Sequence, residues 1–498
     1  MAGSSPTPPE RLPTGIPGLD TILQGGLLKG RTYMLMGLPG GGKTILANQV
    51  CFHHATTGGR VLYVTLLAES HTDLVGNLAS LRFFNASRIP EAITYLSAFS
   101  VLEQGGLDAL AELIRKEARA HQASLLVLDG LMAAEEVAPS TRALKKFIHG
   151  LQVLSQLVGC TTLVLTTGGG QGLGAEHTMV DGLLVLKQRL FGVRALRELV
   201  VRKFRGSAYL MGPHGFEITG DGISVYPRLE TLLEPQGHGP SGTARHAFGI
   251  AGLDKMLRGG MPVGGTTILI GAPGAGKTLL GMRFLVEGAL QGERGHYFAF
   301  YDSPERMVTQ MASIGVDLEP LIASEALEVS YRPPTENLLD KLGIQLLTAI
   351  RERGVKRLFL DGFEGLERAT VRKQRAARFL AALVNECRVR GVSLVYTMET
   401  MSAFGPEVMF PMKGLSMVAE NILFLRTTEL HSELRRFICA LKVRNSDFDP
   451  SLRELLITKK GLEVGGTFED AQHLITGLAR THSKKAPRSR HLLKRRRK

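Results

Sequence analysis

Gly37-Leu38-Pro39-Gly40-Gly41-Gly42-Lys43-Thr44 is the stretch from which the rest of the chain is interpreted. Glycines lack side chains, so they let backbone N–H groups approach a nucleotide phosphate closely. In such a loop Lys43 reaches the outer phosphates, and the Thr44 hydroxyl takes a magnesium position. The flanks agree, because residues 32–36 form an apolar run typical of a buried strand and residues 44–57 suit a helix that begins at the phosphates. The alternative is an ordinary glycine-rich turn.

The whole arrangement occurs twice. Gly271-Ala272-Pro273-Gly274-Ala275-Gly276-Lys277-Thr278 repeats the loop, and Gly15 and Lys43 recur 234 positions later as Gly249 and Lys277. A period of this length indicates duplicated domains rather than a solenoid. We predict a disordered arm over 1–12, a first domain over 13–234, a linker over 235–246, a second domain over 247–479 and a basic, disordered tail over 480–498.

Short apolar runs alternate with helical patterns in both halves. Such alternation predicts an α/β fold with a mainly parallel sheet covered on both faces. Strands are expected at 61–66, 125–129, 161–166, 182–189 and 194–203, and again at 296–300, 358–361, 393–397, 420–426 and 436–443. Helices are expected at 73–82, 106–121 and 142–158, and again at 304–314, 335–353 and 373–390.

Two aspartates end apolar strands, where α/β sheets place their ligand crevice. Asp129 and Asp361 can hold magnesium through its waters, opposite the loop residues Thr44 and Thr278. The alternative is an aspartate that caps a strand-to-loop turn. Loop, threonine and aspartate together predict an ATP–Mg²⁺ site in each half.

Hydrolysis needs a further group that orients or deprotonates the attacking water. Glu69 and Asp302 are the candidates, because each follows the strand that we expect beside the phosphate-loop strand. Asp302 is one methylene shorter than a glutamate. The alternative is an exposed acid at a strand end.

Lys203-Phe204-Arg205 and Lys442-Val443-Arg444 end corresponding strands. Strand alternation places the two cations of each trio on one side. Lys203, Arg205, Lys442 and Arg444 are therefore candidates to stabilise phosphoryl charge in a neighbouring subunit, as an arginine finger does. The alternative is a solvated, positively charged strand end.

The chain has 498 residues, of which 44% are hydrophobic and 21% charged, as in ordinary globular proteins. Much of its net charge of +14 lies in the last nineteen residues, which hold ten Lys and Arg and no Asp or Glu. The four cysteines make no metal-ligand spacing and indicate reduced thiols in a cytoplasmic protein. No apolar run approaches the ~20 residues of a membrane span, so we expect no membrane partner.

Taken together, the Gly-Leu-Asp opening segment, the paired phosphate loops, the strand-end acids and the Lys-x-Arg trios resemble the KaiC family of RecA-like ATPases. The resemblance covers about residues 13–479. It implies two tandem RecA-like domains that bind ATP and Mg²⁺, stacked in a double-ring homohexamer with nucleotide held between subunits. In that family two adjacent glutamates follow the second strand, and the Lys and Arg of the trio act on the neighbour's nucleotide.

The chain departs from the family in three places. The paired glutamates are replaced by Ala68-Glu69 and Tyr301-Asp302, so we expect hydrolysis to be slow, above all in the second half. Where the family's clock protein has two adjacent phosphorylated residues, the match here is Ser416-Met417, which leaves autokinase activity open. The chain is more similar to the non-clock members.

Three functions remain open at this point. The first is an ATPase that signals to protein partners through nucleotide-dependent ring assembly. The second is a DNA-dependent motor, suggested by the basic tail, which gains affinity for nucleic acid by counterion release but carries no aromatic residue for base stacking. The third is a nucleotide-sensing scaffold with little catalysis.

Overall fold

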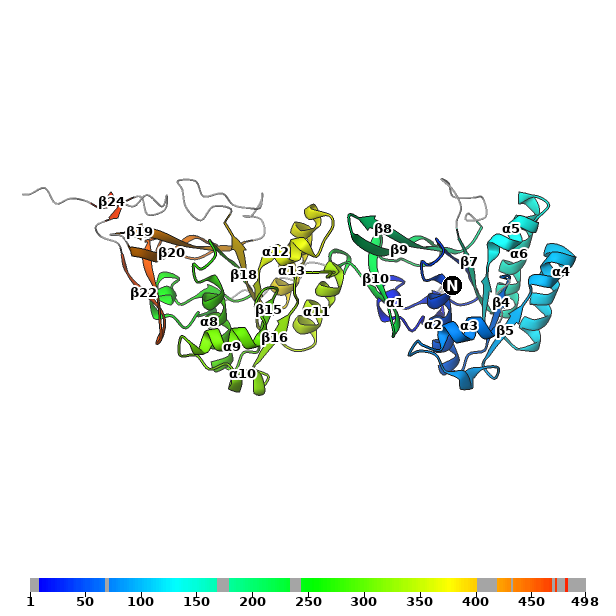
Figure 1. Cartoon of the computed structure of the whole chain (residues 1–498), viewed down its shortest axis with the longest axis horizontal. Helices are drawn as coiled ribbons and strands as arrows, with labels where there is room; N and C mark the ends of the chain where they lie inside the picture. Colours follow the sequence, from blue (N-terminus) through cyan, green and yellow to red (C-terminus); the bar gives the residue numbers. More distant parts are fainter. Residues whose placement is uncertain are drawn as a thin grey trace, which may run out of the picture. The chain divides into compact units, whose positions relative to one another are not determined.

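The computed structural model describes residues 9–67, 71–167, 179–232, 243–400, 419–430, 433–467, 471–472 and 480–481. Contacts within the chain divide it into two units, Met1–Leu232 with Asp340–Ile344 and Leu233–Leu339 with Gln345–Lys498 (Figure 1). Each unit is built around a nine-stranded sheet.

The first sheet has the order β11-β10-β9-β8-β3-β7-β6-β4-β5. The strands from β8 to β5 in this order are parallel, whereas β8 to β11 run antiparallel to one another. Their bounds are β3 Thr32–Gly37, β4 Val61–Thr65, β5 Ile93–Ser97, β6 Leu125–Asp129, β7 Thr161–Thr166, β8 Gly182–Phe191, β9 Arg194–Phe204, β10 Pro213–Thr219 and β11 Gly222–Tyr226.

Helices cover both faces of this sheet (Figure 1). One face carries α1 (Pro17–Ile22), α2 (Lys43–Thr56) and α3 (His71–Leu78), and the other carries α4 (Phe99–Ala120), α5 (Leu131–Val137) and α6 (Thr141–Val158). Alternate residues of each strand supply the two cores, since Tyr63 packs with α1 and α2 while its neighbours Leu62 and Val64 pack with α4 to α6. A short pair, β1 (Arg11–Leu12) and β2 (Leu27–Leu28), precedes the sheet.

The second sheet repeats this topology. Its order, β16-β15-β17-β18-β14-β19-β20-β21-β22, is that of the first sheet listed from the opposite edge. The strands are β14 Thr266–Gly271, β15 Gly295–Ala299, β16 Leu327–Tyr331, β17 Arg357–Asp361, β18 Ser393–Glu399, β19 Asn421–Leu430, β20 Glu433–Val443, β21 Arg453–Thr458 and β22 Gly461–Thr467.

The helices of the second unit again lie on both faces. On one side are α7 (Ala251–Met256), α8 (Lys277–Leu290), α9 (Pro304–Ala312) and α10 (Glu319–Ala323), and on the other are α11 (Leu339–Arg351), α12 (Phe363–Arg368) and α13 (Lys373–Val389) (Figure 1). The short strands β12 (Arg245–His246) and β13 (Met261–Pro262) pair as β1 and β2 do, and β23 (Ala471–Gln472) pairs with β24 (Arg480–Thr481).

The α/β class and the mainly parallel sheets are confirmed. The antiparallel arrangement of the outer strands was not predicted, because β8 is continuously buried over its first half and exposed toward the hairpin tip, and so lacks the alternation that is typical of an antiparallel strand. Helix α4 begins before the predicted residue 106, with a kink at Gly106. The strands β1 and β12 lie within the predicted arm and linker.

One expectation about the sheet was wrong. We expected the strand before Glu69 to lie beside the phosphate-loop strand, but β7 and β6 separate β4 from β3. In the second unit β18 and β17 separate β15, which precedes Asp302, from β14. The physical reason is the order in which the strands join the sheet. After β3 the chain crosses over to β4, three positions along the sheet, and the later strands β6 and β7 pair in the two positions between them.

The β8–β9 and β19–β20 pairings each contain a bulge immediately before the lysine of the Lys-x-Arg trio. Lys203 pairs with Leu183 and Val201 with Leu184, so Arg202 is the extra residue, and Leu441 takes the same place in β20. The equivalent irregularity in both units indicates a feature of the fold rather than an accident of one sheet.

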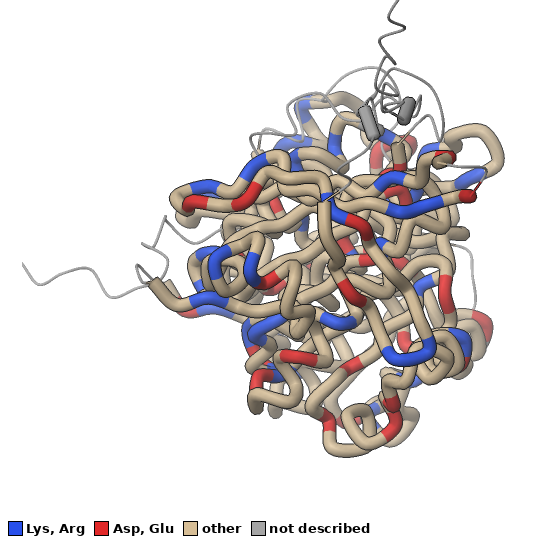
Figure 2. Tube along the Cα trace, turned by 90° about the vertical axis from the view of Figure 1, so that its left-hand side faces the viewer, with Lys and Arg blue, Asp and Glu red and all other residues tan. Residues whose placement is uncertain are grey.

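Basic and acidic residues are interspersed over the surface in the view of Figure 2. The predicted tail, apart from residues 480–481, lies outside the described residues, as does the linker over 235–242. Among the helices that the structure describes, none combines the length and the apolar character needed to cross a bilayer. The four cysteines are buried and unpaired.

Candidate nucleotide-binding sites

Both phosphate loops (residues 37–44 and 271–278) connect a central strand to the start of a helix. The residue before each helix is a glycine with left-handed backbone, Gly42 at φ 95° and Gly276 at φ 99°. The left-handed backbone at Gly42 favours glycine, and a Cβ there would also displace the Ile218 side chain of β10, whose Cδ1 would lie 2.8 Å away. No side chain caps either helix, which leaves the first N–H groups of α2 and α8 directed at the loop, where they can bind an anion.

The two loop lysines are held by their own loops. Lys43 Nζ donates to the carbonyls of Gly37 at 2.7 Å and Leu38 at 3.1 Å. Lys277 Nζ donates to Gly271 at 2.9 Å and Ala272 at 3.0 Å. Burial lowers the pKa of both ammonium groups, and nearby carboxylates oppose this effect. Each ammonium group is thus held at the loop where the predicted outer phosphates would bind.

The predicted magnesium residues of the first unit lie in direct contact. Thr44 Oγ1 donates to Asp129 Oδ2 at 3.0 Å, and the Tyr63 hydroxyl donates to the same oxygen at 2.6 Å. Burial raises the pKa of Asp129, against the hydrogen bonds from Tyr63 and Thr44 and the charge of Lys43, which lower it. The oxygen donors that Mg²⁺ prefers therefore come together at this loop.

The second unit repeats the contact with one addition. Asp361 accepts from the Tyr297 hydroxyl at 3.1 Å and from Thr397 Oγ1 at 2.7 Å, and a hydrogen bond from Thr278 also opposes the rise in its pKa that burial causes. Thr397 also accepts from the N–H of Gly362 at 2.7 Å. The extra hydroxyl fixes the Asp361 carboxylate more tightly than Asp129 is fixed.

A cleft of about 550 Å³ opens above the second phosphate loop, within the range of small-molecule sites. Its lining includes both predicted metal residues and Asp302, whose charge contributes to the raised pKa of Asp361. Asp302 Oδ1 lies 3.9 Å from Arg306 Nη1, and the neighbouring Tyr301 is exposed. The lining residues are Pro273, Gly274, Gly276, Lys277, Thr278, Leu279, Tyr301, Asp302, Gln310, Asp361, Gly362, Glu364, Thr397, Glu399, Arg436 and Ile457.

Glu69 lies outside the described residues. Counting from the matched strands β4 and β15, where Tyr63 and Tyr297 occupy equivalent positions, Asp302 corresponds to Ala68 rather than to Glu69. The two acids that the sequence suggested as partners are therefore one residue apart in strand register, and their roles remain predictions.

Two carboxylates in the second cleft were missed. Glu399 ends β18, directly beside the phosphate-loop strand, and its N–H donates to Glu364 Oε1 at 2.8 Å. Burial raises the pKa of Glu364. An acid that ends an apolar strand is the sign that singled out Asp129, and it could have found Glu399 as well.

The cations of each trio lie far from the phosphate loop of their own unit. In the first sheet Tyr33 pairs with Gly182 and Gly182 with Phe204, so the trio is level with the start of β3, while the loop follows its last residue, Gly37. Four residues of strand separate the two levels by about 13 Å. In the second unit Lys442 Nζ donates to the carbonyl of Ala419 at 2.9 Å, at the corresponding edge. The cations that were predicted to act on a neighbouring subunit therefore do not lie at the phosphate loop of their own unit.

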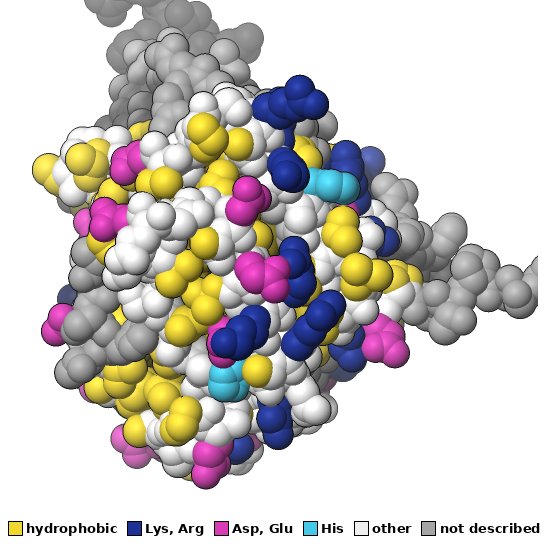
Figure 3. All heavy atoms as spheres, turned by 90° about the vertical axis from the view of Figure 1, so that its right-hand side faces the viewer, with side chains coloured by type: hydrophobic (Ala, Val, Ile, Leu, Met, Phe, Trp, Pro, Cys, Tyr) yellow, Lys and Arg dark blue, Asp and Glu magenta, His cyan; other side chains and the backbone are white. Residues whose placement is uncertain are grey.

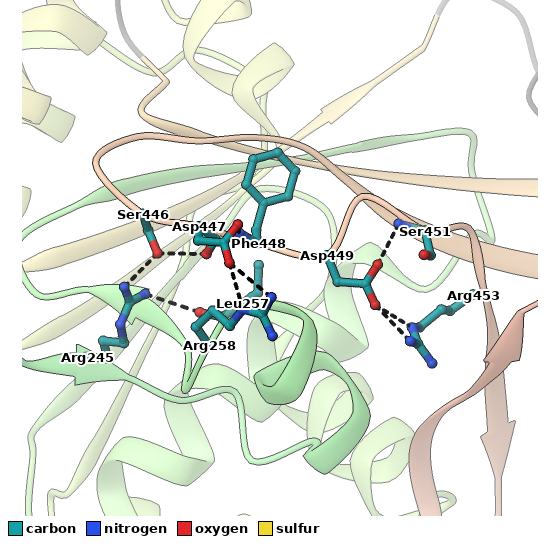
Figure 4. Close-up of polar contacts among 9 residues, drawn as sticks. All are labelled: Arg245, Leu257, Arg258, Ser446, Asp447, Phe448, Asp449, Ser451 and Arg453. Carbon is teal, nitrogen blue, oxygen red and sulfur yellow. Dashed lines mark hydrogen bonds and ion pairs between the residues drawn. The ribbon is translucent and has the colours of Figure 1, made fainter.

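The segment after Arg444 is anchored by polar contacts (Figure 4). Arg245 donates to the carbonyl of Leu257 at 3.1 Å and to Ser446 Oγ at 2.6 Å, and Arg258 lies 2.9 Å from Asp447. Further along the segment Asp449 accepts from Arg453 at 2.7 Å. These contacts fix the chain next to Arg444 against the loop that follows α7.

The first unit has the same anchor. Arg11, which lies 234 positions before Arg245, donates to the carbonyl of Leu23 at 2.8 Å and to Ser207 Oγ at 2.6 Å. Sequence analysis did not find either arginine. Their common period with the phosphate loops is the signal that could have found them.

Two phosphate loops, each paired with a strand-end aspartate and set on a mainly parallel sheet, define a tandem P-loop nucleotide-binding protein. The model of the KaiC ATPase family matches residues 12–230 and 247–468. The chain belongs to the KaiC family, as the sequence motifs predicted.

Relatives match over almost the whole chain. A protein of Picosynechococcus sp. is 29% identical over 485 residues, which cover 94% of this chain and 92% of the relative. Proteins of Rippkaea orientalis and Thermostichus vulcanus are each 28% identical, over 94% of this chain and 91% of the relative. All three are named circadian clock oscillator protein KaiC.

Proposed function

We propose that each chain binds two Mg²⁺–ATP complexes, hydrolyses ATP slowly and acts in regulation through nucleotide-dependent assembly into a homohexameric ring. The observation that carries the proposal is the repeated contact between a loop threonine and a strand-end aspartate, such as Thr44 with Asp129 at 3.0 Å. Family membership supports the ATPase class.

Each residue has a role in this proposal. Loop N–H groups bind the phosphates, Lys43 and Lys277 neutralise the outer ones, and Thr44 with Asp129 and Thr278 with Asp361 hold the cation. The bound Mg²⁺ supplies charge neutralisation at the phosphates. Glu69 in the first site and Asp302 in the second orient the attacking water.

Assembly is supported by the position of the trios and by exposed apolar residues. The trio cations are level with the end of β3 opposite to the phosphate loop, so the phosphoryl charge that they would stabilise belongs to another site, as a ring of subunits would supply. Figure 3 views the first unit from the side of α4 and α6, and hydrophobic and basic side chains both gather there. The exposed apolar residues of α5 and α6 are Met132, Val137, Val153, Leu157 and Val158.

A scaffold that binds nucleotide with little catalysis is the second candidate. By strand register Asp302 corresponds to Ala68, so Ser303 takes the place that Glu69 has in the first unit, and Asp302 is the single acid at this strand end. The two functions could also be divided between the sites. In that case the first site alone would hydrolyse ATP, and the second would bind nucleotide without turnover.

The test is ATP turnover together with mass by light scattering, for the wild type, Glu69→Gln and Asp302→Asn, with and without single-stranded DNA. We expect DNA-independent turnover from a hexamer, lost mainly in Glu69→Gln. Glu305→Gln is the matched control, because Glu305 is an exposed acid of α9 outside the cleft lining. Assembly without turnover would establish the scaffold, and turnover stimulated by DNA would establish the motor.

A further inference from the structure

We propose that Tyr63 of β4 is a positioning residue of the first nucleotide site, whose hydroxyl holds the Asp129 carboxylate in the orientation that binds the cation of Mg²⁺–ATP. The inference rests on the proposed binding of Mg²⁺–ATP by this site. It gives a role to a side chain that is itself fully buried and acts through Asp129.

The first argument is the pattern of hydrogen bonds on Asp129. The Tyr63 hydroxyl donates to Asp129 Oδ2 at 2.6 Å, and Thr44 Oγ1 donates to the same oxygen at 3.0 Å. The terminal torsion of an aspartate has broad minima, so the carboxylate turns readily unless donors fix it. Because both donors lie on Oδ2, the other oxygen accepts no hydrogen bond from the described residues and is available to a cation-bound water.

The second argument is that Tyr63 is itself held in place. Its ring packs against that of Tyr95, the residue opposite in β5, with the ring centroids 5.1 Å apart. The Tyr95 hydroxyl donates to Asn48 Oδ1 at 2.7 Å, and Asn48 Nδ2 donates to the carbonyl of Thr44 at 2.9 Å. These contacts lead back to Thr44, so one set of side chains holds both the loop threonine and the strand-end aspartate of the site.

The third argument is a comparison with the second unit. Tyr297 of β15 occupies the register position of Tyr63 and donates to Asp361 Oδ2 at 3.1 Å. There Thr397 Oγ1 also donates to Asp361 Oδ1, at 2.7 Å, so both carboxylate oxygens are held. The orientation of Asp129 therefore depends more on its tyrosine than the orientation of Asp361 does.

The support of the two tyrosines differs in the same sense. Val329 lies opposite Tyr297 in the sheet, as Tyr95 lies opposite Tyr63. The residue 234 positions after Asn48 is a methionine of α8. A valine and a methionine cannot form the hydrogen bond that joins Tyr95 to Asn48, so of the two units the first has the polar support.

Tyr33 of β3 provides a matched control. It is buried in the same core as Tyr63, but its hydroxyl contacts the backbone of Leu28, accepting from the N–H at 2.7 Å and donating to the carbonyl at 3.2 Å. Tyr33→Phe therefore removes the same hydroxyl group from the same core without touching Asp129. A loss that is common to Tyr33→Phe and Tyr63→Phe belongs to the fold and not to the cation site.

The experiment measures the ATP affinity of the full-length protein by equilibrium dialysis, in excess Mg²⁺ and again in excess EDTA. Tyr63→Phe and Tyr33→Phe are each combined with Lys277→Ala, so that the first site is measured, and Tyr297→Phe is combined with Lys43→Ala, so that the second is measured. The quantity compared is the ratio of the affinity in Mg²⁺ to the affinity in EDTA. A residue that orients a cation-binding carboxylate changes this ratio, whereas a residue that only packs changes both affinities together.

We expect Tyr63→Phe to lower the ratio about 10-fold and to leave the affinity in EDTA unchanged, as is typical when a hydrogen-bond partner of a metal-binding carboxylate is removed. Tyr297→Phe should lower the ratio by about 3-fold or less, because Thr397 still holds the carboxylate. Tyr33→Phe should leave the ratio unchanged.

The outcomes separate this inference from the proposed function. If Lys277→Ala alone binds ATP equally well in Mg²⁺ and in EDTA, the proposed cation site of the first unit fails. If Mg²⁺ strengthens binding and Tyr63→Phe leaves the ratio unchanged, the inference is overturned. An equal fall of both affinities in Tyr63→Phe, or the same fall of the ratio in Tyr33→Phe, would also overturn it, because the packing of the sheet would then be responsible.

Discussion

The surroundings of the two phosphate loops share one scaffold but differ in charge. Where the second unit has Glu364 and Glu399, counting on from the matched strands gives Met132 and Thr167 in the first, and Thr167 Oγ1 donates to Met132 Sδ at 3.1 Å. A neutral contact therefore replaces a pair of carboxylates. Among the carboxylates that the structure describes, Glu399 acts most strongly on Lys277, where its charge opposes the lowering of the pKa by burial.

This difference teaches that duplication preserved the loop lysine, the loop threonine and the strand-end aspartate and changed the charges around them. The loop lysines, the loop threonines and the strand-end aspartates match pair by pair, and of the loop glycines only Gly41 differs, with Ala275 in its place. The added carboxylates make the second cleft more dependent on a cation, because an unneutralised triphosphate is repelled by them. The predictions below test whether the two sites behave as this comparison requires.

The largest effect is expected from the loop lysines. Lys43→Ala and Lys277→Ala each remove an ammonium group from one loop, and we expect each to weaken one of two bound nucleotides by about 100-fold or more. Equilibrium dialysis with Mg²⁺ and ATP measures the stoichiometry, and the double variant should bind none. Loss of both nucleotides in a single variant would mean that the sites are not separate binders.

The loop glycines should differ in what they tolerate. Gly42→Ala and Gly276→Ala each force a left-handed residue to carry a Cβ, at about 1–2 kcal/mol. The first variant should lose more, because its Cβ would lie 2.8 Å from Ile218 Cδ1, against 3.2 Å from Ile457 Cδ1 in the second. Calorimetry without nucleotide follows the unfolding of each unit, and a larger loss in Gly276→Ala would contradict the expected order.

The extra acids should make ATP binding depend on Mg²⁺. In Glu399→Gln we expect the second site to bind ATP about 3- to 5-fold more tightly in excess EDTA, since a carboxylate near Lys277 is removed. The converse variant, Thr167→Glu, should weaken the first site by a similar factor. Titration calorimetry with and without Mg²⁺ measures both, and unchanged affinities in EDTA would refute the electrostatic difference between the clefts.

The smallest effect concerns pH. Burial raises the pKa of Glu364 above its ordinary value of 4.5, so the folded protein holds this proton more tightly than the unfolded chain. The stability contribution of Glu364 is then fully present below pH 4.5 and is lost as the pH rises through the folded-state pKa. Glu364→Gln should be more stable than the wild type at pH 7, with an advantage that disappears below pH 4.5.

Thermal unfolding of the nucleotide-free protein at several pH values measures this difference. Met132→Gln is the matched control, because it places the same amide at the equivalent position where no carboxylate was present. An advantage of Glu364→Gln that did not change with pH would show that packing, rather than ionisation, is responsible.

Local signals predicted much of the fold and part of the site. The glycines of the loops and the apolar strands that end at Asp129 and Asp361 are short-range patterns, and the structure brings loop and aspartate together in each unit. The sheet order is a long-range property, which is why β4 was expected beside β3. For the same reason Arg436, Arg11 and Arg245 were missed, since their partners lie far away in the sequence.

The strand β20 connects the cleft of its own unit to the Lys-x-Arg trio that follows it. Arg436 meets the cleft of its own chain at one end, and Lys442 and Arg444 follow at the other, six and eight residues later, or about 20–26 Å away. Because β20 is hydrogen-bonded to β19 along its length and to β21 in part, a displacement of one end would be shared with the neighbouring strands. The register of its pairing with β19 is interrupted at the bulge at Leu441, immediately before Lys442. In a closed ring the β20 strand of each subunit would run from one nucleotide site toward the next. The occupancy of one site would then affect where Lys442 and Arg444 lie at the neighbouring site.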